Sequence, residues 1–223
     1  MHNKLNIDQI YVCHWGKLND RKEYIINHLN KKGIYDFKFI DSYDKENWNI
    51  EEIKKTYPVI FNSFAHNAYG ITNIPLKYSE ISLVLKHCQI IKEIVDKKYS
   101  SVLIFEDDVL LHNDFINQFN SYKSQLPDGW DLAWVGSCCN LHAPYQESKN
   151  VYEMDGTRCT HAYAVSYEGA CKILPILESV NDAADWFLNR VIKQLNLKNY
   201  WFEPPLAYPN TKFITTIANN IFN

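Results

Sequence analysis

Three consecutive carboxylates, Glu106, Asp107 and Asp108, directly follow the continuous apolar run at residues 102–105. Such a run predicts a strand that is buried on both faces, as in a parallel sheet. Adjacent like charges repel one another, and at the end of a buried strand they lose part of their hydration. The residues that follow, 109–111, are apolar, so the local sequence supplies no positive partner. Because carboxylate oxygens are ligands for Mg²⁺ or Mn²⁺, the motif indicates a divalent metal site.

The spacing of these acids divides them into two sets. Alternate residues of an extended chain face the same side, so Glu106 and Asp108 are expected to share a side and Asp107 to point the other way. Two carboxylates together with substrate phosphates form a common partial cage for such a metal. The alternative is a solvated acidic turn at a strand end. The metal site is favoured because ligands of α/β sheets bind at the carboxyl ends of the strands.

The rest of the chain alternates between short apolar runs and stretches with helical spacing. This alternation predicts an α/β domain in which a mainly parallel central sheet is flanked by helices. With 223 residues and only 7 glycines and 8 prolines, the chain is expected to form one domain over residues 1–223. The expected strands cover residues 10–12, 37–41, 102–105, 132–135, 163–165 and 200–202, and the expected helices cover residues 21–31, 79–95, 113–125, 169–177 and 186–195.

One expected helix carries two polar residues inside an apolar sector. Ser79 has the character of an N-cap, and Glu80 falls in the first turn. Glu80 and His87 are separated by two helical turns and therefore lie almost on one line. Apolar side chains flank that line on both sides, and polar groups in a buried sector need partners. Those partners are either protein groups, such as the acidic strand end, or a substrate.

Composition argues against several classes of protein. A hydrophobic fraction of 46% and a net charge of -3 are typical of a globular chain without the basic face of a nucleic-acid-binding protein. No run of about 18 apolar residues is present, so no membrane-spanning helix is expected. The first residues lack the apolar core of a signal peptide, and a cytoplasmic location is expected. The six cysteines, including the vicinal pair Cys138 and Cys139, lack zinc-finger spacing and are expected to be reduced and mostly buried.

Four blocks in one order resemble glycosyltransferase family 25, which includes lipooligosaccharide and procollagen galactosyltransferases. They are the segment SEISLVLKH at 79–87, the acidic motif at 106–108, the segment THAYAVS at 160–166 with the Gly-Ala pair that follows, and the pair Asp185 and Trp186. An opening strand around residues 11–12 and the later Arg21 match more loosely. The resemblance therefore touches most of the chain.

The chain departs from the family pattern at several positions. Cys13 and His14 stand where the family usually has Asn-Leu, Ser82 replaces a Gly, and Lys86 replaces a Ser. Residues 48–78 match no block. We expect this stretch to be mainly loop with short helices and to carry acceptor specificity.

The resemblance implies a GT-A type fold that holds a nucleotide sugar, usually UDP-linked, through a metal, Mn²⁺ or Mg²⁺. It also implies an inverting reaction. The expected activity is transfer of a hexose, galactose or glucose, from a UDP-sugar to a hydroxyl of a glycan or of a hydroxylysine-type acceptor. The alternative is a degenerate relative that binds nucleotide or glycan without turnover, which the departures at residues 13, 14 and 86 keep open. A metal-dependent phosphohydrolase is less consistent, because that class usually places its nucleophilic Asp after the first strand.

Each role in such a transfer has candidate residues. Asp108 is the first candidate for the metal, with Glu106 or Asp107 assisting. His161 precedes an expected buried strand and is either a metal or phosphate ligand or a structural residue. The acceptor hydroxyl needs a base. Asp185 is favoured as that base and Asp182 is second, although either could simply stabilise a helix N-terminus. The residues expected to contact the donor are Glu106, Asp107, Arg21, Tyr11, Val12, Glu80 and His87.

Overall fold

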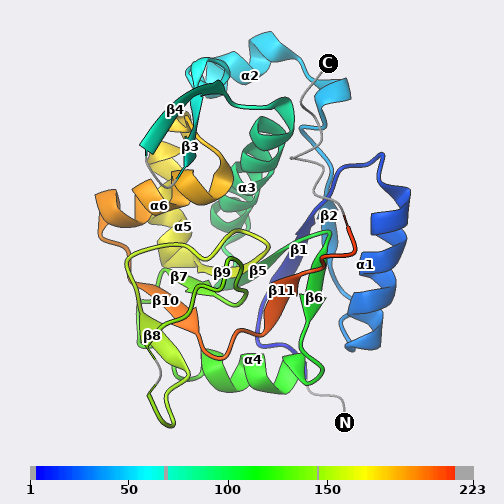
Figure 1. The fold of residues 1–223 in the computed structure, drawn as a ribbon, viewed down its shortest axis with the longest axis vertical. Coiled ribbons are helices and arrows are strands. Elements are labelled where there is room, and N and C mark those ends of the chain that lie inside the picture. The colour runs from blue at the N-terminus through cyan, green and yellow to red at the C-terminus, as the bar shows by residue number, and fades with distance from the viewer. Residues whose placement is uncertain (1–3, 68–69, 145, 214–223) are drawn as a thin grey trace.

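A seven-stranded sheet in the order β2-β1-β5-β9-β7-β10-β8 forms the centre of the protein (Figure 1). The computed structural model describes residues 4–67, 70–144 and 146–213. The strands of this sheet are β1 (Gln9–Cys13), β2 (Lys38–Ile40), β5 (Ser101–Glu106), β7 (Leu132–Trp134), β8 (Val151–Glu153), β9 (Ala162–Ser166) and β10 (Asn199–Phe202).

The sheet is mainly parallel, as predicted. Strands β2, β1, β5, β7 and β10 run in one direction, whereas β9 and β8 run in the other. Strand β9 lies between β5 and β7 and pairs antiparallel with both. Every residue of β1 and β9 is buried, which explains why both sequences are mainly apolar, apart from Gln9 and Ser166 at their ends, rather than alternating. The predicted α/β class is confirmed.

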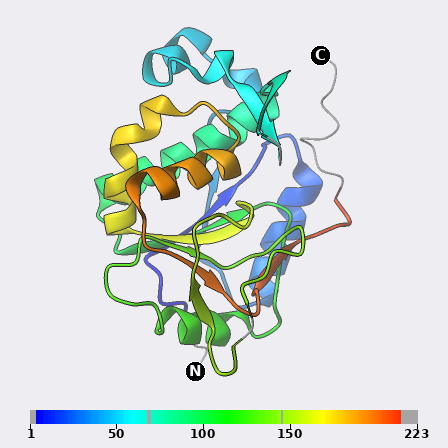
Figure 2. The ribbon, with the colours of Figure 1, turned by 60° about the vertical axis from the view of Figure 1, so that its left-hand side comes forward.

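Helices cover both faces of the sheet. Alternate residues of the central strands face two different cores, because successive side chains of a strand point to opposite faces. Tyr11 and Ile104 pack with α3, α5 and α6, whereas Val12 and Phe105 pack with α1 and α4. Figure 2 shows the two helical layers on either side of the sheet. The helices are α1 (Asn19–Lys31), α2 (Ile50–Thr56), α3 (Tyr78–Lys97), α4 (Phe115–Lys123), α5 (Tyr167–Ile173) and α6 (Ala184–Leu195), with 3-10 turns at Lys45–Asn47, Ile60–Asn62 and Leu174–Ser179.

The start of α3 differs from the sequence prediction. The N-cap is Lys77, not Ser79, and its backbone N–H donates to Glu80 Oε2 over 2.7 Å. The helix therefore begins at Tyr78, and Glu80 is the residue whose side chain satisfies the cap. Within the described residues, no helix combines the length and the apolarity that crossing a bilayer requires.

The stretch at residues 48–78 contains more structure than predicted. It includes the short helix α2, as expected, but also an antiparallel hairpin of β3 (Phe64–Asn67) and β4 (Gly70–Pro75). Ile71 and Ile74 are exposed on this hairpin, so it lacks the pattern of one buried face that marks a strand. A second two-stranded pairing, of β6 (Val109–Leu111) with β11 (Ala207–Pro209), was also not predicted.

The expectation that all six thiols are reduced is wrong, because Cys138 and Cys159 form a disulfide. The register of β7 and β9 explains the pairing. Trp134 lies opposite Tyr163 in this antiparallel pair, so the chain leaving β7 and the chain entering β9 run side by side. Cys138 lies four residues after Trp134, and Cys159 lies four residues before Tyr163. The sulfurs meet because of a strand direction that the cysteine spacing does not reveal.

Replacing Gly169 with Ala is expected to destabilise the protein strongly. Helix α5 approaches the start of β7 so closely that a Cβ at Gly169 would lie 2.5 Å from the Asp131 carbonyl oxygen. This neighbour is backbone and cannot turn aside, so we expect a loss of about 3 kcal/mol in the free energy of unfolding, measured by urea denaturation. The matched variant Glu168→Ala, at an exposed position of the same turn, should change it by less than about 0.5 kcal/mol.

His28 gives stability a predictable dependence on pH. Its Nε2 accepts the Leu111 backbone N–H over 2.9 Å, and burial, aided by Lys32 and Lys31, lowers the His28 pKa from 6.5 to about 4. The unfolded chain therefore binds a proton that the folded chain rejects, and stability falls as pH drops from 6.5 towards 4. In His28→Gln, the loss over this window, measured by urea titrations, should be smaller by roughly 2 kcal/mol. Equal losses in both proteins would contradict the assignment.

Candidate functional site

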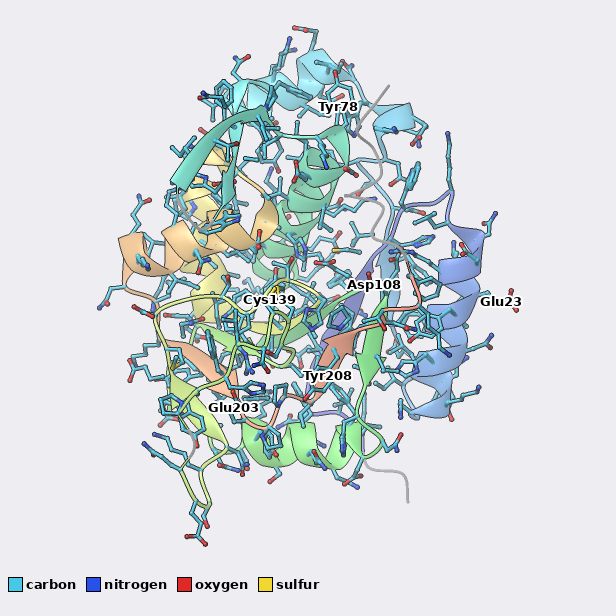
Figure 3. All side chains as sticks on the ribbon, in the orientation of Figure 1. Glu23, Tyr78, Asp108, Cys139, Glu203 and Tyr208 are labelled. Atoms are coloured by element: carbon cyan, nitrogen blue, oxygen red, sulfur yellow. A yellow bond between two sulfur atoms is a disulfide. The ribbon has the colours of Figure 1, made fainter. Side chains whose placement is uncertain are left out.

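The acidic motif lies at the carboxyl edge of the parallel strands, where the sequence placed it. β1 and β5 are paired in register, with Cys13 opposite Glu106, so the two strands end together. Asp107 and Asp108 form the turn that leads into β6. Figure 3 shows Asp108 over the middle of the molecule, on the side to which these strands point.

Asp107 is held by two residues from the chain that follows β1. His14 Nδ1 lies 2.7 Å from Asp107 Oδ2, and Arg21 Nη1 donates to Asp107 Oδ1 over 3.0 Å. Arg21 Nη1 is also 3.5 Å from Asp108 Oδ2. The residues that directly follow the motif supply no positive charge, as the sequence indicated, but α1, which is distant in sequence, supplies Arg21. Asp107 has a structural role in joining β1, α1 and the motif.

Glu106 is oriented by residues behind it. Thr160 Oγ1 donates to Glu106 Oε1 over 2.6 Å, and His87 Nε2 lies 3.8 Å from the same oxygen. Burial alone would raise the pKa of Glu106, but His87 and Thr160 outweigh it and hold that pKa below its usual range. The carboxylate is thus ionised and fixed in direction.

His87 acts from inside the protein core. It is 3% exposed, and its Nδ1 lies 2.9 Å from the Tyr163 hydroxyl. Burial would lower the pKa of His87, but Cys13 and Glu106 outweigh burial and raise it. The partner of His87 is therefore the acidic end of β5, where its Nε2 lies 3.8 Å from Glu106 Oε1. Glu80, two turns earlier, lines a cavity in addition to capping α3.

Asp108 carries the least compensated charge of the motif. Burial, followed by the charges of Glu106 and Asp107, raises the pKa of Asp108 to about 7, and Arg21 only partly opposes them. Its side chain is 16% exposed. A cation beside Asp108 would relieve this excess of negative charge.

Two cavities meet at Glu106, Asp108 and Leu83, which line both. The first, of about 140 Å³, lies over the end of β1. The second, of about 340 Å³, lies towards the start of α6. The first cavity is also lined by Trp15, Arg21, Lys45, Tyr78 and Asp107, and the second by His66, Glu80, Thr160, His161, Asp185 and Trp186.

Asp185 and Asp182 differ in their surroundings. Asp185 lines the second cavity, and burial, with the charges of Glu106 and Glu80, raises its pKa. Its Oδ1 also accepts the Trp186 backbone N–H over 2.9 Å. Asp182 contacts His66 Nδ1 from the β3–β4 hairpin and is not among the residues that line the cavity. The structure therefore brings Asp185, and not Asp182, to the cavity that contains the acidic motif.

His161 is positioned by the backbone around it. Its Nε2 lies 3.4 Å from the Ala207 carbonyl oxygen, and a Cβ at Gly136 would lie 2.3 Å from the same nitrogen. Burial lowers the pKa of His161 and favours the neutral ring. The ring lines the second cavity, while the His161 carbonyl oxygen accepts the Glu106 backbone N–H over 3.0 Å.

Tyr11 and Val12 are not brought to the two cavities. Both are completely buried in the sheet, and the Tyr11 hydroxyl donates to Glu93 over 2.5 Å. Neither side chain lines a cavity where a donor could contact it, in contrast to the expectation from the sequence. The strand itself matters, because the residues that follow it, Cys13 and His14, line the first cavity.

Several residues of the site were not identified from the sequence. His14 and Lys86 were treated as departures from a pattern, yet His14 binds Asp107, and Lys86 Nζ donates to the His14 carbonyl oxygen over 2.6 Å. Lys86 also pairs with Asp44 and is 2% exposed. A lysine inside the apolar sector of α3 was the available signal, since a buried charge requires a partner.

The family model that matches this chain assigns its α/β domain, which carries a carboxylate motif between two cavities, to the glycosyltransferase class. The chain belongs to glycosyltransferase family 25 (LPS biosynthesis protein), whose family model matches residues 7–188. This membership confirms the resemblance found in the sequence.

Curated relatives agree with the family. Procollagen galactosyltransferase 2 of Mus musculus is 25% identical over 231 residues, covering 93% of this chain and 36% of that protein. A procollagen lysyl hydroxylase and glycosyltransferase of Acanthamoeba polyphaga mimivirus is 23% identical over 189 residues. This alignment covers 75% of this chain and 19% of the viral protein. The chain thus spans well under half of the length of these relatives. A solved glycosyltransferase involved in glycosylation of the major capsid of PBCV-1 aligns with 92% of this chain and 93% of its own, at 13% identity and a TM-score of 0.49.

Proposed function

We propose that the protein is a metal-dependent, inverting glycosyltransferase. It moves a hexose, galactose or glucose, from a UDP-sugar to a hydroxyl of a glycan or of a hydroxylysine-type acceptor. The observation that carries this proposal is the position of Glu106 and Asp108 in the wall shared by two cavities. Transfer requires a donor and an acceptor to meet at one point, and these two cavities meet at the carboxylates.

The residues that line the first cavity suit a nucleoside diphosphate. Trp15 and Tyr78 offer aromatic surfaces for a base or ribose, and Arg21 and Lys45 offer positive charge for phosphates. His14 adds a buried Nε2 that has no hydrogen-bond partner within the described residues. The cavity therefore combines the apolar and cationic groups that such a donor needs.

Glu106 and Asp108 fit a divalent metal that is shared with the donor. Within the described residues, the only set of three or more His, Cys, Asp or Glu ligands with close donor atoms is a cysteine cluster, so a metal at the acidic motif would complete its coordination with diphosphate oxygens. A metal held there would neutralise the charge that develops on the leaving diphosphate. Asp107 is already bound by His14 and Arg21 and is not a ligand in this proposal.

Asp185 is the proposed base in the second cavity. An inverting single displacement needs one carboxylate near the acceptor hydroxyl, and the raised pKa of Asp185 favours accepting that proton. Trp186, which stacks on His66 at 5.6 Å between ring centroids, offers an aromatic face beside it. The name of the mouse relative, procollagen galactosyltransferase 2, favours galactose as the sugar and a procollagen-like protein as the acceptor.

A thermal-shift panel of nucleotide sugars, with and without Mn²⁺, tests the proposal. Ligand at 100 times its dissociation constant should stabilise the protein by about 2.7 kcal/mol. We expect a shift with a UDP-sugar only when the metal is present, followed by release of UDP when an acceptor is added. Absence of any metal-dependent shift would refute the proposed donor, and binding without UDP release would indicate the degenerate alternative.

A further inference from the structure

Three cysteines form a cluster beside the second cavity, and two of them, Cys138 and Cys159, line it. Cys138 and Cys159 form the disulfide, and the exposed Cys139 has its sulfur within 4.8 Å of both of their sulfurs. Cys139, Asn140 and Cys159 all have positive φ angles, of 53°, 56° and 66°. Such angles are uncommon outside glycine and tend to gather at functional sites. Figure 3 shows Cys139 near the centre of the molecule, in the same region as Asp108.

The disulfide is next in sequence to a residue that contacts the acidic motif. Cys138 and Cys159 line the second cavity together with Glu106 and Asp108. The residue after Cys159 is Thr160, whose hydroxyl donates to Glu106 Oε1 over 2.6 Å. The covalent link therefore fixes the segment that orients Glu106.

The two segments joined by the disulfide have a second connection that does not depend on sulfur. Arg158 Nη2 donates to the Leu141 carbonyl oxygen over 2.6 Å, and Nη1 donates to the Phe202 carbonyl oxygen over 2.9 Å. The same guanidinium pairs with Glu203 at 3.0 Å. Opening the disulfide should therefore loosen Cys159 and Thr160 without detaching the whole segment.

We propose that the Cys138–Cys159 disulfide is an exchangeable link that positions Thr160 against Glu106, with Cys139 as the exchanging thiol. The Cys139 thiolate attacks Cys159 Sγ, the Cys139–Cys159 bond forms, and Cys138 leaves as a thiolate, so exchange needs no oxidant. A dithiol reductant opens the link completely, is itself oxidised to a disulfide, and leaves three thiols. The consequence for donor binding rests on the proposed function.

The affinity for UDP with Mn²⁺, measured by calorimetry on the oxidised and the dithiol-reduced protein, tests the link. Reduction should remove the hydrogen bond from Thr160 to the ionised Glu106 carboxylate, and the affinity for UDP with Mn²⁺ should therefore fall about tenfold. Thr160→Val should weaken the oxidised protein equally and remove any further effect of reduction, whereas Thr160→Ser should retain the wild-type response. Equal affinities in the two redox states, or a full effect of reduction in Thr160→Val, would overturn the proposal.

Two further measurements separate this proposal from the proposed function. Melting temperatures of wild type and Thr160→Val can be measured in both redox states without a ligand. Reduction should lower the melting temperature of wild type more than that of Thr160→Val. If UDP does not bind, the proposed function fails, and these temperatures alone support or overturn the link. If UDP binds with the expected redox dependence but no sugar is transferred, only the proposed function fails.

The role of Cys139 is tested by mapping the disulfide after rapid alkylation. Wild type should contain both Cys138–Cys159 and Cys139–Cys159 pairs, and Cys139→Ser only the first. Cys171→Ser, which removes a thiol on α5 outside the cluster, is the matched control and should behave like wild type in every measurement. A wild-type protein with only the Cys138–Cys159 pair would overturn the exchange.

Discussion

Replacing Asp108 with Asn is expected to abolish the Mn²⁺-dependent stabilisation by UDP and to lower kcat by about 10³-fold. Asp108 is the acid of the motif with the least compensation from protein groups, and it faces both cavities. The amide keeps the shape of the side chain but removes the negative charge that would hold a metal. The unliganded protein should not be less stable than wild type, because the change also removes repulsion with Glu106 and Asp107. Calorimetry with UDP and Mn²⁺, together with initial rates, measures the effect.

The neighbouring variant Asp107→Asn provides the matched control. Asp107 is bound by His14 and Arg21 in a buried setting, so its loss leaves Arg21 poorly compensated. We expect Asp107→Asn to lower the free energy of unfolding by about 3 kcal/mol. The two variants should therefore have different effects: Asp108→Asn should impair ligand binding, and Asp107→Asn should impair stability. Full activity in Asp108→Asn, or loss of its fold, would contradict the metal assignment.

The sequence predicted the elements that local patterns determine. Continuous apolar runs identified β1, β5, β7, β9 and β10, because strands buried on both faces leave that signature, and helical spacing identified α1 and α3 to α6. The acidic motif could be placed at the sheet edge, since it follows a buried strand directly. The hairpin of β3 and β4 was missed because its exposed Ile71 and Ile74 do not mark a buried face.

The partners of the motif depend on contacts between distant segments, which no local pattern contains. Arg21 reaches Asp107 across 86 positions, and Lys86 reaches Asp44 across 42. The direction of β9, and with it the meeting of Cys138 and Cys159, follows from strand pairing rather than from cysteine spacing. Sequence reasoning therefore placed the acidic motif at the carboxyl edge of the sheet, whereas the residues that contact the motif could be identified only from the fold.

Replacing Asp185 with Asn is expected to lower kcat by about 10²- to 10⁴-fold while leaving the donor KM nearly unchanged. The amide cannot accept the proton of the acceptor hydroxyl, yet it can still accept the Trp186 backbone N–H that Asp185 Oδ1 accepts now. Initial rates at varied donor concentration separate the two parameters. A large loss of donor affinity instead would make Asp185 a binding residue.

Stability and pH dependence give this variant a second signature. Because burial and the charges of Glu106 and Glu80 raise the folded-state pKa of Asp185, its ionised form opposes folding at neutral pH. Asp185→Asn should therefore unfold at a higher urea concentration than wild type at pH 7. In wild type, kcat should rise with pH as Asp185 loses its proton, above the usual range for Asp, and this limb should be absent in the variant.

Two other aspartates calibrate the result. Asp128→Asn, at an exposed loop position, should leave kcat and stability unchanged. Asp182→Asn weakens the contact with His66 and should reduce kcat less than Asp185→Asn, because Asp182 is not among the cavity-lining residues. If Asp182→Asn loses more activity than Asp185→Asn, the two roles are exchanged, and the base acts through the hairpin that carries His66. The order of these two losses decides which carboxylate accepts the proton.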